Sequence, residues 1–244
     1  MSATQGKRKR QWKGNKGGPQ KQQYAGAASY QNRTTAMVKP TGEVKGMDLA
    51  LTIGSVLSST NTNGSAFCLN LLASGAASYN RVGRKIALKS VRLTGQVNGT
   101  HALNTLARGD ALVRMVVVWD KQPNGALPAW DAVFGTTDAT GTTASDVHAA
   151  VRYDEMGRFS ILHEKVIKLE PHCDGNAGTV YTMCAFDKYI KLKGKECVYS
   201  GATADIGSLN SGGIYVYFRK VETAAGPVTV SVNDNSFARL RYVD

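Results

Sequence analysis

Period-two alternation of apolar and polar residues recurs through the chain after residue 42, and this pattern restricts the fold more than any other. In GIYVYFRK (residues 213–220), Ile, Val and Phe face one side of an extended chain, while Tyr, Tyr and Arg face the other. Such alternation is typical of a half-buried strand in an antiparallel sheet. Helical periodicity is almost absent, so the sequence predicts an all-β protein.

Turn-forming residues separate the alternating segments, which have the lengths of ordinary strands. ALVRMVVVWD (111–120) is apolar on both faces except for Arg114, which indicates a central, buried strand. Pro128 favours one short helix over residues 128–135. The expected strands lie within 44–58, 65–72, 84–97, 111–120, 158–170, 180–192, 196–203, 213–220 and 228–243. Eight main antiparallel strands across residues 43–244 indicate a β-sandwich, with a single jelly roll as the leading candidate.

Two strands have a face that can be assigned from the alternation. In residues 84–97, one face is expected to carry Ala87, Val91, Leu93 and Val97, with Lys89 among them. In residues 158–170, one face is expected to carry Phe159, Ile161, Ile167 and Leu169. We expect these faces to point into the core.

Positive charge is concentrated before the first expected strand. Residues 1–42 hold nine Lys or Arg and no Asp or Glu, whereas the remaining residues hold 21 basic and 18 acidic side chains. A block of like charge repels itself and lacks the apolar content to fold, so we expect a disordered basic arm over residues 1–42. Basic arms displace counterions from phosphates and so bind nucleic acid without sequence preference.

The arm has three other interpretations. KRKR (Lys7, Arg8, Lys9, Arg10) is sufficient for a nuclear localisation signal, which is compatible with nucleic-acid binding. A solubilising tail or a patch for an acidic membrane surface would also be basic. The arm has no apolar face to insert, and aromatic residues that can stack on unpaired bases lie among its charges. The expected nucleic-acid contacts in the arm are Lys7, Arg8, Lys9, Arg10, Trp12, Lys13, Lys16 and Lys21.

Composition argues against several other classes of protein. The sequence contains no run of about 18 apolar residues, which a membrane-spanning helix would require. Its first residues also lack the apolar stretch of a signal peptide. Cys68, Cys173, Cys184 and Cys197 have no CxxC spacing, which argues against a zinc site and a disulfide framework. Buried, reduced thiols are the simplest interpretation.

The sequence contains no convincing catalytic or metal-binding constellation. The four histidines are dispersed, and neighbouring residues in PHCDG (171–175) point to opposite faces of an extended chain. A GxSxG motif is absent, and the Gly-rich residues 201–213 lack the Lys of a phosphate loop. Asp120 and Asp131 are better explained as a turn residue and a helix-starting residue. We therefore predict no enzyme, no metal and no cofactor.

Four motifs in chain order resemble the coat proteins of small circular single-stranded DNA viruses that encode their own replication initiator (CRESS-DNA viruses). The first is R-x-x-x-V-x-D followed by K/R-Q-x-x-G and a Pro. The matching residues are Arg114, Val118, Asp120, Lys121, Gln122, Gly125 and Pro128. The others are similar to NRVGRKIALKSVRL (80–93), GRFSILHEKVIKL (157–169) and the closing FARLRYVD (237–244).

This resemblance implies a viral capsid protein with a single jelly roll, as in geminiviruses and satellite necrosis viruses. It implies assembly into an icosahedral shell, in the simplest case T=1 with sixty copies, around a single-stranded DNA genome. The implied partners are the DNA, other copies of the chain and a host nuclear import receptor, with no membrane. The implied locations are the virion and, during assembly, the host nucleus. The motifs leave the virus family, the host, and a single or paired shell open.

Basic residues near one expected strand are candidates for the inner surface of such a shell. Arg81, Arg84 and Lys85 are the expected nucleic-acid contacts there, with Lys89 and Arg92 further along the strand. A solvated strand edge, or ion pairs with a neighbouring subunit, would explain the same residues.

Two other functions compete with a DNA-virus capsid. A cellular single-stranded nucleic-acid-binding protein would need aromatic platforms, for which Tyr215 and Tyr217 are the candidates. A satellite-type RNA virus coat protein would share the fold and the arm, because phosphate contacts do not distinguish DNA from RNA.

Overall fold

A computed structural model describes residues 42–56, 65–102, 111–137, 143–144, 147–169, 179–221 and 229–244. The strands and helical turns are β1 (Val44–Ala50), β2 (Ala66–Cys68), β3 (Lys85–Ala102), β4 (Ala111–Asp120), α2 (Trp130–Val133), β5 (Thr136–Thr137), β6 (Thr143–Ala144), η2 (Tyr153–Glu155), β7 (Phe159–Leu169), β8 (Thr179–Tyr199), η3 (Ile206–Ser208), β9 (Leu209–Ser211), β10 (Gly213–Val221), β11 (Thr229–Val232) and β12 (Phe237–Val243). From Gly42 onward these elements belong to one unit.

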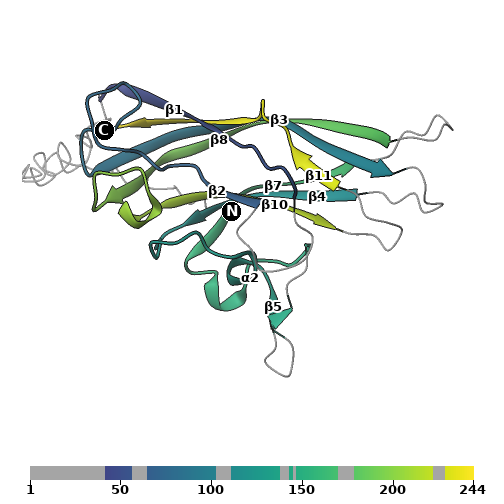
Figure 1. The fold of residues 1–244 in the computed structure, drawn as a ribbon. Helices are drawn as coiled ribbons and strands as arrows, with labels where there is room; N and C mark the ends of the chain where they lie inside the picture. Colours follow the sequence, from purple (N-terminus) through teal and green to yellow (C-terminus); the bar gives the residue numbers. More distant parts are fainter. Residues whose placement is uncertain are drawn as a thin grey trace, which may run out of the picture. The chain divides into compact units, whose positions relative to one another are not determined.

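Two antiparallel sheets form the body of this unit (Figure 1). The six-stranded sheet has the order β1-β12-β3-β8-β9, with β11 pairing onto β3, and the four-stranded sheet has the order β2-β10-β4-β7. Strands far apart in sequence are neighbours, because β1 pairs with β12 and β2 pairs with β10. This interleaving of early and late strands confirms the predicted jelly roll.

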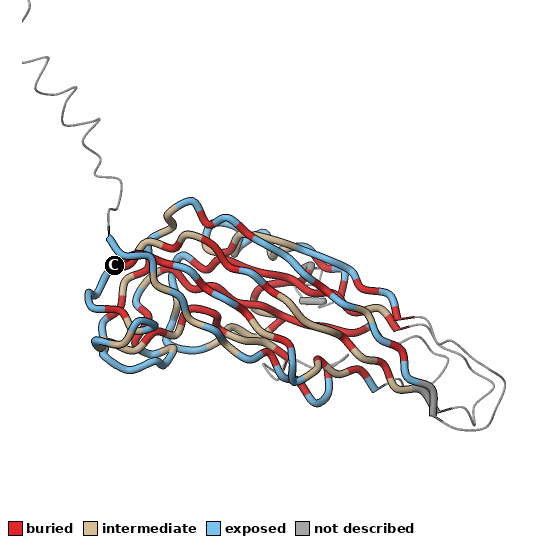
Figure 2. Tube along the Cα trace, turned by 90° about the horizontal axis from the view of Figure 1, so that it is seen from above, coloured by how far each residue is buried: buried red, intermediate tan, exposed pale blue. Residues whose placement is uncertain are grey.

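The core lies between the two sheets. Buried residues (red) alternate with more exposed residues along most strands (Figure 2), because successive side chains point to opposite faces of a sheet. β4 is buried along its length, as predicted for a central strand. β10 was expected to be half-buried, but Tyr215 and Tyr217 on its second face are also buried. α2 lies on the side of the four-stranded sheet away from the six-stranded sheet (Figure 1), and Trp130 of α2 makes an edge contact with Tyr217. The helix was predicted over residues 128–135, and only 130–133 are helical.

A bulge between β3 and β8 corrects the predicted face of β3. The pairing shifts between Leu88 and Ser90, where β8 carries Lys193 and Gly194 with φ of 53° and 74°. A bulge exchanges the two faces of a strand. The core side therefore runs through Ile86 and Leu88 before the bulge, and through Val91, Leu93 and Val97 after it. Ala87 and Lys89 are only partly buried.

Three other expectations on strand boundaries and faces were wrong. Residues 180–192 and 196–203 were taken as separate strands, but β8 passes through the bulge without ending. Residues 228–243 were taken as one strand, but the turn at Asn233–Ser236 divides them into β11 and β12. Ile161 was placed on the core face of β7, yet its side chain is 39% exposed, and β7 has its own bulge beside it.

Buried polar groups join the loops to the core. The Asp120 carboxylate, at the end of β4, accepts two hydrogen bonds of 2.9 Å from Arg158 and one of 2.9 Å from the Gln122 amide. The Asn70 carboxamide accepts from the Ile214 amide at 2.9 Å and donates to the Gly212 carbonyl at 2.9 Å. Such groups are fully desolvated, so their partners keep them stable in the interior.

Two cysteines lie in the same region. Cys68 and Cys197 are buried free thiols on either side of the Asn70 side chain. Burial raises the pKa of Cys68 to about 12 and also raises that of Cys197. Both thiols are therefore protonated at neutral pH. Cys184 is a partly buried free thiol, and Cys173 lies outside the described residues.

Candidate nucleic-acid interface

The outer face of the six-stranded sheet is the face that points away from the four-stranded sheet. It carries a concentration of basic side chains. Alternation places Arg239 and Arg241 of β12 outward, because Ala238, Leu240 and Tyr242 point into the core. The same argument places Lys191 outward between the buried Ile190 and Leu192. We define the basic half of this face by its exposed residues Lys85, Arg92, Lys191, Arg239 and Arg241.

A row of ion pairs crosses the basic half over four strands. Arg239 of β12 lies directly opposite Arg92 of β3 in the strand register. Arg239 donates two hydrogen bonds of 2.7 Å to Asp48 of β1, and Arg92 donates to Asp187 of β8 at 3.0 and 2.6 Å. Each arginine therefore has the carboxylate that it binds on one neighbouring strand and the other arginine on the opposite neighbouring strand.

These pairs favour the charged forms of all four groups. Hydrogen bonding from Arg239 lowers the pKa of Asp48, and hydrogen bonding from Arg92 lowers the pKa of Asp187. The same bonds raise the pKa of both arginines. All four side chains are about half exposed, so an incoming anion can reach the guanidinium groups. Exposed pairs contribute little stability and can be exchanged for another anion at low cost.

The other half of the outer face is polar and aromatic. Tyr181 and Met183 of β8 are each 70% exposed there, whereas Tyr189, which is 52% exposed, lies opposite Arg92 in the basic half. Gln96 and Asn98 face the first two from β3, and the Gln96 amide donates to Asn98 at 2.7 Å. Exposed aromatic rings beside amides and arginines match the chemistry of unpaired nucleotides, which combine a stacking surface, polar base edges and a phosphate.

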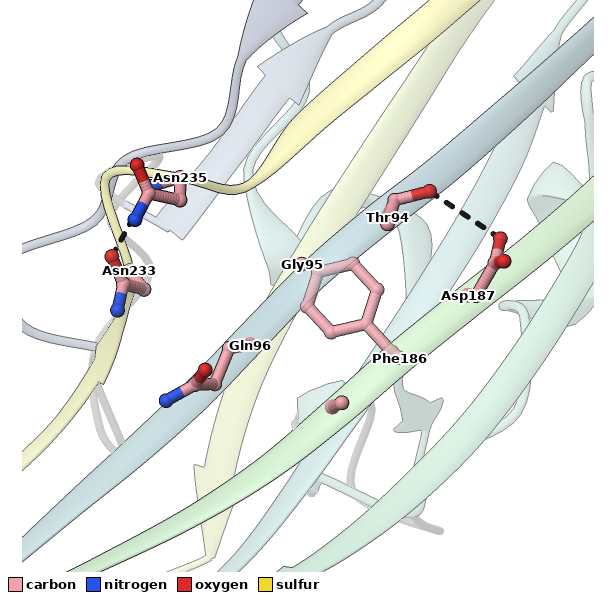
Figure 3. A pocket seen from close by; sticks show the side chains of 8 residues that line it. Thr94, Gly95, Gln96, Phe186, Asp187, Asn233 and Asn235 are labelled. Carbon is pink, nitrogen blue, oxygen red and sulfur yellow. Dashed lines mark hydrogen bonds between the residues drawn. The ribbon is translucent and has the colours of Figure 1, made fainter.

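A hollow of about 450 Å³ lies between the two halves (Figure 3). Its wall residues come from β3, from β8 and from the turn between β11 and β12. They are Thr94, Gly95, Gln96, Ala185, Phe186, Asp187, Asn233 and Asn235. Thr94 donates to Asp187 at 3.3 Å, and the Asn235 amide donates to the Asn233 side chain at 3.1 Å. The walls are therefore held in place by hydrogen bonds.

The three predicted contacts at the start of β3 have different environments. Arg84 and Lys85 are exposed, and Lys85 pairs with Glu196 at 2.8 Å. Arg81 is 2% exposed, and its guanidinium donates to the carbonyls of Leu72, Gly83 and Gly201 and lies over the Tyr199 ring. These bonds assign Arg81 a structural role in closing the loop before β3, so we leave it out of the proposed contact surface.

The remaining predicted contacts cannot be placed. Lys7, Arg8, Lys9, Arg10, Trp12, Lys13, Lys16 and Lys21 lie outside the described residues. The same holds for the sequence PHCDG at 171–175. Lys89 is partly buried beside the bulge, and Arg92 is exposed on the outer face.

Sequence reasoning missed the contribution of β8 and β12 to the basic half. Arg239 and Arg241 are spaced two residues apart within an apolar alternation, which is the signal of outward-facing charge on a strand. Tyr189 and Lys191 have the same spacing in β8. Only the fold shows that β8 and β12 lie on either side of β3 in one sheet.

Other candidate sites lose support in the described part of the chain. Tyr215 and Tyr217 are buried and cannot stack on a base, which removes the aromatic platform proposed for a cellular binding module. Within the ranges that the structure describes, no group of three or more His, Cys, Asp or Glu side chains is arranged to hold a metal ion. No helix among those residues is long and apolar enough to cross a membrane.

Sequence comparison links the chain to one family. The model of the family described as "Geminivirus coat protein/nuclear export factor BR1 family" matches residues 2–237. This match spans both the basic residues at the start and nearly all of the two sheets. No curated protein matches the chain.

Comparison with solved structures found similarity to two viral proteins. A chain of Israeli acute paralysis virus (full particle, heated to 63 degrees) matches with 12% identity and a TM-score of 0.24, covering 84% of this chain and 69% of that chain. VP1 of trichodysplasia spinulosa-associated polyomavirus, in complex with GM1 oligosaccharide, matches with 7% identity and a TM-score of 0.18, covering 83% and 95%.

Proposed function

This chain belongs to the geminivirus coat protein family, and from that premise we propose that this capsid protein assembles into a closed icosahedral shell around single-stranded DNA. The proposed shell is the simplest one, T=1, with sixty copies of one chain. The observation that supports packaging is the segregation of charge, with nine basic and no acidic residues in 1–42. A coat protein has a structural role, so we propose no catalytic activity.

The arm is proposed to neutralise the genome. In a shell of sixty copies, the arms would supply about 540 positive charges against one negative charge per nucleotide. That number balances only part of the charge of a small circular genome. The basic half of the outer face would supply further contacts, and counterions would supply the rest.

We propose that the basic half acts together with the arm in binding the genome. The chain passes directly from residue 42 into β1, the strand that carries Asp48 in the ion-pair row. β1 pairs with β12, which carries Arg239 and Arg241. We therefore propose that the outer face of the six-stranded sheet is the face turned toward the DNA.

The same basic residues are proposed to serve nuclear import. Lys7 to Arg10 form a run of four positive charges, which is the kind of signal that an import receptor recognises. Under this proposal the chain enters the host nucleus for assembly and is later found in the virion. A fusion of residues 1–16 to a cytoplasmic reporter should accumulate in the nucleus, and a reporter that stays in the cytoplasm would limit the arm to packaging.

Sedimentation of the purified full-length chain, read at 260 and 280 nm, tests the packaging proposal. We expect one fast species of megadalton size with strong absorbance at 260 nm, and nuclease treatment of the extracted nucleic acid identifies DNA or RNA. RNA would favour the satellite-type coat protein. A slow species of monomer mass under assembly conditions would refute the shell and favour a binding module.

Two variants separate the arm from the sheet. Deletion of residues 1–23 removes seven basic residues, and a matched variant keeps the length but replaces those seven by Gln. Both should lose most of the packaged nucleic acid while the β-sheet circular dichroism spectrum is unchanged. Retention of full packaging by the Gln variant would refute a charge-based role for the arm.

A further inference from the structure

We propose that the hollow on the outer face of the six-stranded sheet receives an unpaired nucleobase of the packaged strand. In this proposal Arg92 binds the phosphate of the same nucleotide, and Tyr189 stacks on a neighbouring base. The inference rests on the proposed function and adds to it a contact with the base, which a purely cationic mechanism lacks. Its supporting observations are the volume of the hollow, the amide and carboxylate groups that stand among its mainly apolar walls, and its position beside Arg92 and Tyr189.

The size of the hollow suits one base. Its volume of about 450 Å³ falls in the range of pockets that hold small ligands. Ala185 lies directly opposite Gln96 in the register and lines the hollow together with Gly95 and Phe186. Ala185 itself is exposed, so its small size is not required by the core.

The walls carry the functional groups that recognise base edges. Asn233 and Asn235 bring side-chain amides to the walls, and the Asp187 carboxylate offers acceptors only. Gln96 offers its side-chain oxygen, because its nitrogen donates to Asn98 and Met183. Arg92 and Thr94 both donate to Asp187, so the carboxylate is oriented before any ligand arrives. Asn233 is oriented in turn by the amide of Asn235. The held Asp187 and Asn233 side chains, beside the apolar lining residue Phe186, suit an unpaired base, which has a polar edge and an apolar face.

The neighbouring residues provide the other two contacts of a nucleotide. Arg92 and Tyr189 are directly opposite each other in the register, two residues along their strands from Thr94 and Asp187. That spacing is about 7 Å along the sheet, the reach of a single nucleotide. Asp187 takes two of the five N–H groups of Arg92, so others are able to donate to a phosphate.

The arrangement also balances charge. Asp187 alone would repel a phosphate, but its pairing with Arg92 cancels that charge locally. Arg239 lies on the opposite side of Arg92 and adds a second cation. Arg239 is in turn paired with Asp48 of β1 through two of its N–H groups, so its remaining N–H groups are able to donate to a phosphate.

The test compares two short DNA strands of equal length, one with bases and one abasic, with the full-length chain. Binding is measured by fluorescence anisotropy at about 0.5 M salt, where phosphate contacts of the arm are weakened. We expect the strand with bases to bind roughly tenfold more tightly, because stacking and base contacts are worth about that much.

Filling the hollow is the decisive variant. Ala185→Leu places a larger side chain in the hollow at an exposed position, and the expected result is a severalfold smaller preference, with the remainder due to stacking on aromatic residues outside the hollow. Ala50→Leu makes the identical change at another exposed position of the same sheet, in β1, and should keep the tenfold preference. Asn235→Ala in the exposed turn should reduce the preference severalfold without changing the fold.

Each result has one meaning. Equal binding of the two strands by the unmodified chain would overturn the base site while leaving charge-based packaging intact. An unchanged preference in Ala185→Leu would overturn the location. Failure of both strands to bind, together with a monomeric protein in sedimentation, would refute the proposed function itself.

Discussion

Replacement of Arg158 by Met should destabilise the jelly roll strongly, because it leaves a buried carboxylate without its counter-ion. Asp120 is fully buried, and Arg158 supplies both of its charge-assisted hydrogen bonds, at 2.9 Å each. Removing one partner of a buried ion pair costs about 3–5 kcal/mol. Here the Arg158 side chain is 20% exposed, and Asp120 keeps its bonds from the Gln122 amide and, at 3.4 Å, from the Tyr215 hydroxyl. The cost should therefore lie near the lower limit, about 3 kcal/mol.

Thermal unfolding provides the assay. For a domain of this size, each kcal/mol corresponds to about 2–4 °C in Tm, so Arg158→Met should lower Tm by about 6–12 °C. The measurement uses circular dichroism on the full-length chain under conditions that prevent assembly. Met preserves much of the apolar contact of the Arg158 side chain with Phe159, whose ring lies 4.5 Å from the guanidinium.

Two control variants identify the cause of the effect. Arg158→Lys keeps the charge but loses the two-pronged geometry, and should fall between the wild type and Arg158→Met. The double variant Asp120→Asn with Arg158→Met should be less destabilised than the sum of its single changes, because no buried charge remains. A Tm for Arg158→Met within about 2 °C of wild type, or strict additivity in the double variant, would refute this reasoning.

The remaining predictions concern a buried amide, a surface ion pair and the thiols. Asn70→Ala should lower the free energy of unfolding by about 1–3 kcal/mol in urea titrations, because it leaves the buried Ile214 amide unpaired, while the Gly212 carbonyl keeps its bond from Cys197; an effect below about 0.5 kcal/mol would contradict this. The pKa of Asp48 is lowered by Arg239, so the pair contributes stability above the unfolded Asp pKa of about 3.9, and this contribution is lost as pH falls through the folded value. The Tm difference between wild type and Asp48→Asn should therefore vanish at acid pH, and a difference that grows there would have the wrong sign. Burial raises the pKa of Cys68 to about 12, so iodoacetamide at pH 8 should label the partly buried Cys184 first, as followed by mass spectrometry of peptides; equal rates would show that the β-sandwich opens.

Local patterns were sufficient where the chain itself carries the information. The bounds of β4 were predicted as 111–120 and were found there, because an apolar run ends in the turn signal DKQPNG. The jelly roll followed from the number and spacing of strands together with the resemblance to coat proteins. The residues around Lys193 and Gly194 were interpreted as a break between two strands, whereas they form a bulge within β8 that decides which side chains of β3 reach the core.

The candidate interface depended on contacts between distant residues. Arg81 appeared in a basic segment and was expected at the surface, but carbonyl groups from Leu72 and Gly201 hold it inside. The pairing of Arg92 with Arg239 depends on the register of β3 and β12. Neither relation is encoded within a window of neighbouring residues, so only the tertiary structure reveals it.

The pairing of β1 with β12 also determines when the six-stranded sheet can form during synthesis. Asp48 and Arg239 meet in the sheet although they are 191 residues apart in the chain. At the usual 5–20 residues per second, a ribosome needs about 10–40 s between the two strands. β12 lies between β1 and β3 in the sheet, so β1 has no strand to pair with at this position until β12 has been synthesised. A chain released before Phe237 lacks the strand that joins β1 to β3. The six-stranded sheet can therefore form completely only after β12 has been translated.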